Sequence, residues 1–386
     1  MEAREAYRVF TKEHGVSLSP EAMAYICKGV SEEAAGRAAL LLSQELFGGV
    51  ASVSDLQRVL GARVVARGKV HVESVSFQGG CLRYRALKER ASPGSVSIAA
   101  LKEGRGCTIF GMVRARVLGG MSIEDEDGAI DVGAIDCECF LAPGVCASFE
   151  GRKERGVFNI TKILLPEAPQ RAWVADNLSV LFFSGFLYTT EKLNRLKGAI
   201  ATYNGLGVGI DAVVIMVKGK ESLENAVARI KTVLGEAFLE TEFVVLPGVD
   251  LERKGFYPEG YYQSQGNVTV STNPSSIEIG SRRFLVGAFS ISAGVKKESV
   301  VQGDYRDNIG RVLLSQASYN PFITYTDLSE TREYSGMVIG EEYDSFVQVE
   351  GSRTLAVCGD FDKSEGQFLF YGGSEGVFEI STLADA

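Results

Sequence analysis

Histidine, the side chain that most often transfers protons or binds metals near neutral pH, occurs only twice in this chain, as His14 and His71. No Ser-His or Cys-His catalytic pair can therefore be built from residues after position 71. The scarcity also weighs against zinc and two-metal sites, which commonly use imidazole ligands. We interpret both histidines as surface or packing residues.

Three cysteines lie close together in the sequence, at Cys137, Cys139 and Cys146. A zinc site would need a fourth ligand and usually has Cys-x2-Cys spacing. In a strand, Cys-x-Cys spacing places both thiols on one face, where they pack as small apolar groups. We favour packing, and the odd, scattered total of seven cysteines does not indicate a disulfide framework.

A possible phosphate-binding loop follows an apolar strand at Gly219-Lys220. Glu221 stands where Ser or Thr should bind magnesium, and Val214 occupies the place of the earlier glycine. We interpret the segment as a turn with a solvated lysine.

The acidic run Glu124 to Asp127 offers carboxylates of the kind that bind calcium. It lies between two short apolar runs, which favours a solvated hairpin turn instead.

An aromatic loop around Pro258 could bind another protein, because tyrosine-rich loops supply rigid contact area. The loop could instead pack against the sheet of its own domain, and we weigh the two interpretations about equally. The candidate partner-binding residues are Phe256, Tyr257, Tyr261 and Tyr262.

The composition is that of an ordinary globular protein. The 386 residues include 45% hydrophobic side chains, and the net charge of −9 argues against a non-specific coat for nucleic acid. No run of about 20 apolar residues is present, so we expect a soluble, intracellular protein without a membrane partner. The length predicts two or three domains.

The spacing of apolar and turn residues divides the chain into four regions. We expect a helical domain over 1–61, with helices beginning near Ser19-Pro20 and Ser31, and a mixed connecting region over 62–105. Five short strands over 106–168 predict a small Greek-key barrel, most commonly of the OB-fold class. Between Cys107 and Leu165, six Lys or Arg stand against nine Asp or Glu, which makes a poor DNA groove and favours a protein-binding or structural barrel.

Residues 174–386 begin as an α/β domain. Three apolar runs, near 178–183, 212–217 and 243–246, alternate with two helical segments and predict parallel strands with crossover helices. The remainder is rich in strands, so we expect two sheets packed face to face.

Several stretches, in this order, resemble one family. They are Phe10 to Leu18, the basic helix Leu82 to Arg90, the hairpin Ser122 to Gly128, Val244 to Gly248, Thr272-Asn273-Pro274, Leu314-Ser315-Gln316 and Val338 to Phe346. Their order and spacing are similar to those of the B-subunits of the replicative DNA polymerases, and most similar to the epsilon branch of that family. The resemblance implies an α+β multidomain fold: an N-terminal helical module, an OB-like β-barrel and an inactivated calcineurin-like phosphoesterase α/β two-sheet sandwich.

The resemblance also implies that the phosphoesterase-like domain is catalytically dead. Active members of that superfamily hold two metals with Asp-x-His, Gly-Asp-x-x-Asp, Gly-Asn-His and later His motifs. Here Gly185 and Leu187 replace the first Asp and His, Gly219 replaces the next Asp, and Asp250 follows a strand end without an Asn-His pair. We therefore expect no catalytic residue, no metal and no cofactor.

By resemblance, the chain is a non-catalytic accessory subunit of the DNA polymerase epsilon complex. It would hold the C-terminal region of the catalytic subunit and reach the replicative helicase through that assembly's GINS component, using the N-terminal helical domain. It would act in the nucleus and contact DNA mainly through the complex. Two alternatives stay open: a B-subunit of polymerase delta or alpha, or an active metal-dependent phosphoesterase or nuclease.

Overall fold

A computed structural model describes most of the chain. The 386 residues form two compact units, one of 1–67 with 203–209 and one of 68–202 with 210–386. Each unit is treated by itself. The described residues are 3–14, 16–27, 35, 39, 42, 50–52, 56, 70–74, 81–91, 93–116, 119–167, 177–186, 189–217, 223–247, 266–289, 299–316, 318, 334–341, 345–351 and 353–383.

The first unit contains short helices and one pair of short strands. Its described elements are α1 (Ala3–Tyr7), the π-helix η1 (Arg8–Glu13), β1 (Ser17–Leu18), α2 (Pro20–Cys27) and β2 (Val50–Ala51), with β1 and β2 parallel.

The start of α2 is the one expected from the sequence. The Ala22 backbone N–H donates to Ser19 Oγ at 3.1 Å, so the serine caps the helix ahead of Pro20. Phe10, Ile26 and Leu42 are among the fully buried core residues of this unit. Most residues of the helix expected to begin near Ser31 lie outside the described residues.

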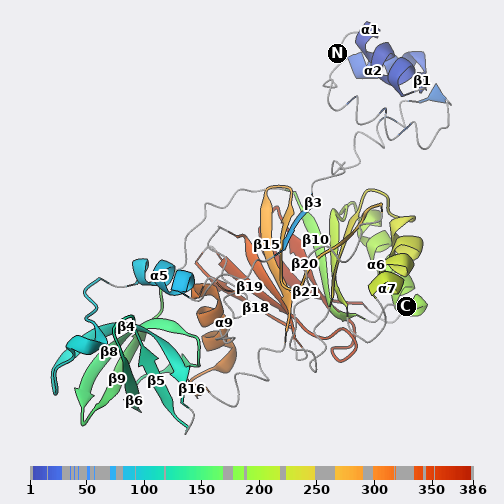
Figure 1. Ribbon diagram of the computed structural model, residues 1–386. Helices are drawn as coiled ribbons and strands as arrows, with labels where there is room; N and C mark the ends of the chain where they lie inside the picture. Colours follow the sequence, from blue (N-terminus) through green and yellow to red (C-terminus); the bar gives the residue numbers. More distant parts are fainter. Residues whose placement is uncertain are drawn as a thin grey trace. The chain divides into compact units, whose positions relative to one another are not determined.

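The first part of the second unit is a closed five-stranded barrel with the order β4-β5-β6-β9-β8 (Figure 1). Its strands are β4 (Gly106–Ala115), β5 (Met121–Glu124), β6 (Ala129–Ile135), β8 (Cys146–Glu154) and β9 (Val157–Leu164). Only the β6–β9 pair of this barrel is parallel. Ile109, Phe149 and Phe158 are fully buried inside it.

Two helices and a short strand flank the barrel. Helix α5 (Cys81–Glu89) agrees with the expected basic helix and packs Tyr84 on Phe110, with ring centroids 5.2 Å apart. The short 3-10 helix η2 (Ile98–Ala100) lies before β4, and β7 (Cys139–Leu141) lies between β6 and β8.

The second part of this unit begins with the parallel strands that the sequence predicted. β10 (Ser179–Phe186), β11 (Ala212–Val217) and β12 (Glu242–Pro247) pair in parallel, which confirms that prediction. β13 (Val268–Val270) continues the sheet on one side, and antiparallel β20 (Gln367–Gly372) and β21 (Val377–Thr382) complete it on the other. The intervening helices are α6 (Thr190–Gly205), α7 (Leu223–Ile230) and the π-helix η3 (Lys231–Gly235).

A second six-stranded sheet has the order β18-β19-β17-β15-β14-β3. Its members are β18 (Phe346–Glu350), β19 (Arg353–Cys358), β17 (Gly336–Gly340), β15 (Arg282–Ala288), β14 (Ser275–Ile279) and β3 (Val70–Ser74). β3 comes from the region 62–105, which the sequence suggested was a mixed connecting region. It pairs antiparallel with β14, some 200 residues later, and such a long-range pairing leaves no local trace in the sequence.

The two sheets pack face to face through an apolar core. Phe182 of the first sheet contacts Phe284 of the second at 5.5 Å between ring centroids, and Tyr371 contacts Phe284 at 5.0 Å. The strands of the first sheet are near-continuous apolar runs because helices cover its other face.

Helix α9 (Tyr305–Ser315) covers the outer face of the second sheet and reaches the barrel (Figure 1). Asp304 caps it, accepting the backbone N–H groups of Arg306 and Asp307. One continuous hydrophobic cluster runs from the barrel through α9 to the second sheet. Among the described residues no helix is long and apolar enough to cross a membrane.

Candidate partner-binding groove

Gly185 is the only described residue among the four expected remnants of a metal site, since Leu187, Gly219 and Asp250 lie outside the described residues. It stands near the end of β10 with a φ of +63°. A Cβ added to Gly185 would lie only 2.6 Å from the carboxyl carbon of Asp360. A side chain at position 185 would therefore collide with that carboxylate.

Asp360 itself is held in place by the turn that follows β19. Its side chain is 2% exposed, and Oδ1 accepts the backbone N–H of Asp362 at 3.0 Å. A β-bridge joins its backbone to Ser184. Asp360 thus fills the space beside Gly185 while capping a turn. Within the described part of the chain, no three His, Cys, Asp or Glu side chains are grouped so that they could hold a metal.

The acidic hairpin between β5 and β6 uses its carboxylates to fasten neighbouring segments. Asp125 accepts the backbone N–H of Ile98 at 2.7 Å and the N–H of Gly128 at 2.8 Å. Glu126 lies 3.0 Å from the ammonium group of Lys88 on α5. These contacts agree with the interpretation as a hairpin turn.

The three clustered cysteines do not share one site. Cys137 lies on a bend before β7 rather than in a strand, which corrects the expectation of a single Cys-x-Cys strand. Burial raises the pKa of Cys137 and raises that of Cys139 to about 11. Both are therefore protonated thiols at neutral pH, a state unsuited to nucleophilic attack. Cys146 is fully buried at the start of β8.

Two other candidates from the sequence lie outside the described residues. These are the Gly219-Lys220 turn and the aromatic loop with Phe256, Tyr257, Tyr261 and Tyr262. Their roles stay predictions.

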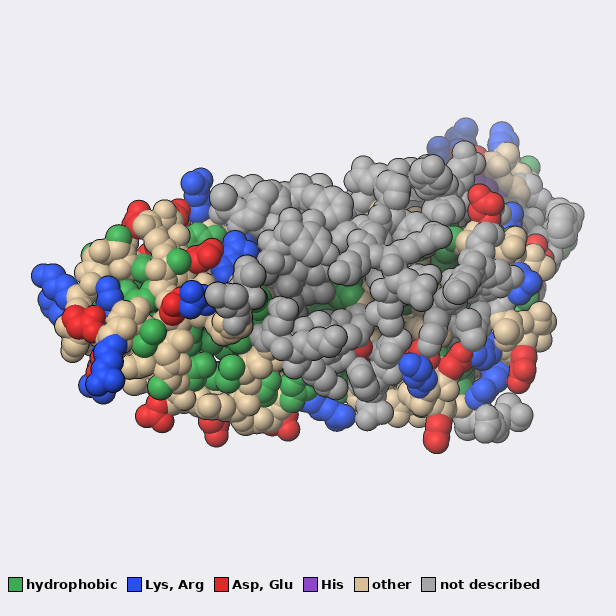
Figure 2. Space-filling view, turned by 60° about the horizontal axis from the view of Figure 1, so that its bottom comes forward, with side chains coloured by type: hydrophobic (Ala, Val, Ile, Leu, Met, Phe, Trp, Pro, Cys, Tyr) green, Lys and Arg blue, Asp and Glu red, His purple; other side chains and the backbone are tan. Residues whose placement is uncertain are grey.

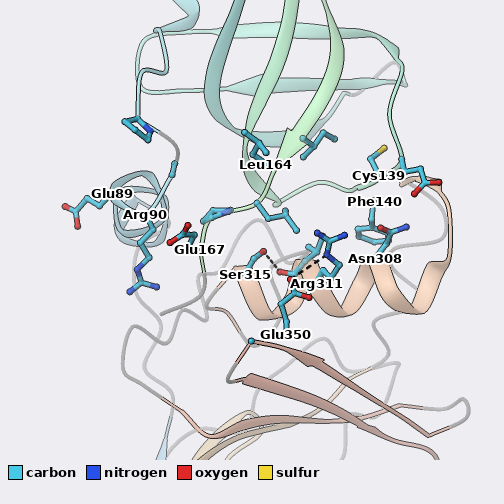
Figure 3. A pocket seen from close by; sticks show the side chains of 18 residues that line it. Glu89, Arg90, Cys139, Phe140, Leu164, Glu167, Asn308, Arg311, Ser315 and Glu350 are labelled. Atoms are coloured by element: carbon cyan, nitrogen blue, oxygen red, sulfur yellow. Dashed lines mark hydrogen bonds and ion pairs between the residues drawn. The ribbon is translucent and has the colours of Figure 1, made fainter. Parts of the chain in front are cut away.

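A groove of about 820 Å³ lies where the barrel meets α9 (Figure 3). Five segments far apart in sequence line it: the end of α5, the start of β7, the end of β9 with residues 165–167, helix α9, and the turn between β18 and β19. In Figure 3, Leu164 extends from the barrel toward the helix, and Asn308 and Arg311 extend from the helix toward the barrel. Phe140 and Val312 are buried side chains at its base.

The rim of the groove is predominantly acidic. Its four carboxylates outnumber its two cations, Arg90 and Arg311, and Arg311 is paired with Glu350 at 3.8 Å. A negative rim suits a polypeptide that carries basic side chains. The four acidic residues, all exposed, are Glu89, Glu138, Glu167 and Glu350.

Gln316, which follows α9, joins the helix to the barrel. Its Nε2 donates to the backbone carbonyl of Cys146 at 2.9 Å, and its Oε1 accepts the Cys146 N–H at 2.8 Å. Gln316 is fully buried, so its amide takes the role of a strand neighbour for the first residue of β8.

Two further contacts fix the walls of the groove. β7 pairs antiparallel with β16 (Val300–Gln302), just before α9, and Phe140 of β7 contacts Tyr305 of the helix at 6.1 Å between ring centroids. Beneath the helix, the buried Arg353 guanidinium stacks 4.2 Å above the Tyr334 ring and donates to the Leu314 carbonyl. The groove is thus built on a rigid, buried support.

Most residues of the groove were not singled out by sequence analysis. Glu138, Asn308 and Arg311 belong to no recognisable motif, and only the fold brings them together. Two stretches quoted for the family resemblance do contribute: Leu82 to Arg90 contains Glu89 and Arg90 of the rim, and Leu314-Ser315-Gln316 contains the joint with the barrel.

Comparison with known proteins leaves the family open. No family model matches the chain. A UDP-N-acetylglucosamine 1-carboxyvinyltransferase of Desulfofundulus thermocisternus is 26% identical over 199 residues, which cover 45% of this chain and 82% of that protein.

Two similar solved structures are an archaeal phosphodiesterase and a protein of Thermus thermophilus. The first is 9% identical, covers 53% of this chain and 99% of its own, and has a TM-score of 0.31. The second is 13% identical, covers 54% and 100%, and has a TM-score of 0.28. Scores this low do not establish a shared fold.

Proposed function

We propose that this chain is a non-catalytic accessory subunit of a replicative DNA polymerase, the B-subunit of polymerase epsilon. The groove between the barrel and α9 would hold the C-terminal region of the catalytic subunit. The observation that carries this proposal is the joint at Gln316, Phe140 and Tyr305, which makes barrel and sandwich one unit with an acidic groove between them.

The geometry at Gly185 supports a role without catalysis. A Cβ at this position would lie so close to the Asp360 carboxylate that a metal-binding side chain has no room there. The sequence adds that no histidine follows His71. A two-metal phosphoesterase needs a nearly complete ligand set at adjoining strand ends.

The finer parts of the proposal rest on the resemblance. Among them, the barrel is assigned to the OB-fold class, and the sandwich is assigned to an inactivated calcineurin-like phosphoesterase fold. They also include contact of the N-terminal helical domain with the GINS component of the replicative helicase, contact with DNA mainly through the complex, and a place in the nucleus. The barrel order β4-β5-β6-β9-β8 supports the first of these.

Co-expression with the catalytic subunit of polymerase epsilon tests the proposal. We expect one copy of each chain in a complex that survives size-exclusion chromatography. Its stoichiometry is measured by light scattering. A chain that elutes alone, with the catalytic C-terminal region present and folded, contradicts the proposal.

Two further experiments distinguish this proposal from its alternatives. Parallel co-expression with the catalytic subunits of polymerases delta and alpha shows which of the three is retained. An active phosphoesterase would instead bind manganese or zinc stoichiometrically and hydrolyse phosphodiesters, and Asp250→Ala would abolish that activity. We expect neither metal nor turnover.

A further inference from the structure

The outer end of the barrel brings together two basic segments. The hairpin between β8 and β9 contains Arg152, Lys153 and Arg155, and the loop before β4 contains Lys102 and Arg105. The Gly104 backbone N–H donates to the carbonyl of Lys153 at 2.8 Å, so the loop lies directly against the hairpin. We name these five cations the basic tip. Figure 2 shows Lys and Arg side chains projecting from the barrel end of the molecule.

Three carboxylates within and beside the basic tip have ion-pair or hydrogen-bond partners. Glu154 pairs with Arg152 at 2.7 Å, and Glu103 accepts the backbone N–H of Arg155. On the adjacent strand, Asp131 is paired with Arg116. Within the two segments, five cations therefore stand against two carboxylates, although the barrel as a whole is acidic.

The backbone at the hairpin turn holds an arginine in an unfavourable conformation. Arg155 has a φ of +52° and the following Gly156 a φ of +82°, the combination of a two-residue turn that favours Asn or Gly at its first position. An arginine there costs conformational energy that asparagine would avoid. The cost is understandable if the guanidinium at the apex has a task.

We propose that the basic tip binds the phosphate backbone of duplex DNA. Clustered Lys and Arg displace the counterions condensed on DNA, and guanidinium groups match phosphate oxygens in geometry. Neither basic segment contains an aromatic residue on which bases could stack, so binding is independent of sequence and stronger for the more densely charged duplex than for a single strand. The inference does not depend on the scaffold proposal.

Fluorescence anisotropy with a labelled duplex of about 30 bp tests the basic tip. The full chain is compared with a variant carrying Lys102→Gln, Arg105→Gln and Arg155→Gln, at about 50 and 200 mM salt. We expect the variant to bind at least about tenfold more weakly, and the slope of log K against log salt to fall by about 0.9 for each cation that contacts a phosphate.

A matched control removes the same charge from α6, α7 and η3, which lie at the other end of this unit (Figure 1). The variant carrying Lys197→Gln, Arg229→Gln and Lys231→Gln should bind DNA within about twofold of the parent chain if position rather than net charge matters. Equal losses in the two triple variants would overturn the proposal, and so would an unaltered chain that binds no duplex at about 50 mM salt.

Arg155→Asn provides a second, independent readout. Asparagine tolerates the positive φ, so we expect a higher melting temperature together with DNA binding about threefold weaker. A variant that merely damaged the barrel would lower both. Unchanged DNA affinity, or a lower melting temperature, would count against the role given to Arg155.

Discussion

Gln316→Leu should lower the free energy of unfolding of the barrel–sandwich unit by about 2–4 kcal/mol. The change keeps the side chain's approximate size but removes both hydrogen bonds to the backbone of Cys146. The Cys146 N–H and carbonyl are then buried without these partners, and each carries a desolvation penalty of about 1–3 kcal/mol. Denaturation in urea, followed by intrinsic fluorescence, measures the loss.

Gln302→Leu serves as the control for this prediction. Gln302 is an exposed residue of β16 in the same part of the fold, and its replacement should change stability by less than about 0.5 kcal/mol. If the two variants are equally stable, Gln316 does not join α9 to the barrel in the way we describe.

Gly185→Asp should destabilise the chain by about 3 kcal/mol or more. Three costs combine: the new Cβ collides with Asp360, an L-residue is forced to a φ of +63°, and a second carboxylate is placed beside a buried one. By the resemblance, an active phosphoesterase would carry Asp at this position, so poor folding of the variant would show that the space beside Gly185 is closed to a side chain. Thermal and urea denaturation measure the effect.

Two further variants isolate the clash at position 185. Gly280→Asp introduces the same residue at a φ of +60° with no atom within 4 Å of the new Cβ. It should lower the free energy of unfolding only by the strain of the backbone conformation, about 1–2 kcal/mol. Combining Gly185→Asp with Asp360→Gly should cost less than the sum of the single changes. Strict additivity in that double-mutant cycle would contradict the close approach.

The local elements of the fold could be anticipated because each leaves a local pattern. The buried parallel strands are short apolar runs separated by helical segments, and Ser19 and Pro20 mark a helix start. The five barrel strands are separated by turn residues at short spacing. In each case the deciding interactions lie within a few residues or follow from uniform burial.

Long-range pairings could not be anticipated in the same way. The placement of β3 beside β14 and of Asp360 against Gly185 depends on residues roughly 175 to 210 positions apart. The groove draws its lining from five separate segments, so its acidic rim has no signature along the chain. Summing the barrel's charge likewise conceals the basic tip, because only the fold brings Lys102 and Arg105 beside the basic run 152–155.

The most direct test of the scaffold proposal is the affinity of the catalytic subunit's C-terminal region for a chain whose groove rim is reversed in charge. In the variant with Glu138→Lys and Glu167→Lys, two exposed carboxylates that line the groove become cations. A control with Glu236→Lys and Glu375→Lys makes the same charge change on exposed residues outside the groove.

Isothermal titration calorimetry measures the three dissociation constants. The scaffold proposal predicts that the groove variant binds at least about tenfold more weakly than the unaltered chain, while the control binds within about twofold, since like charges at an interface oppose docking. Equal affinity of the groove variant and the unaltered chain would contradict the claim that this groove holds the catalytic subunit.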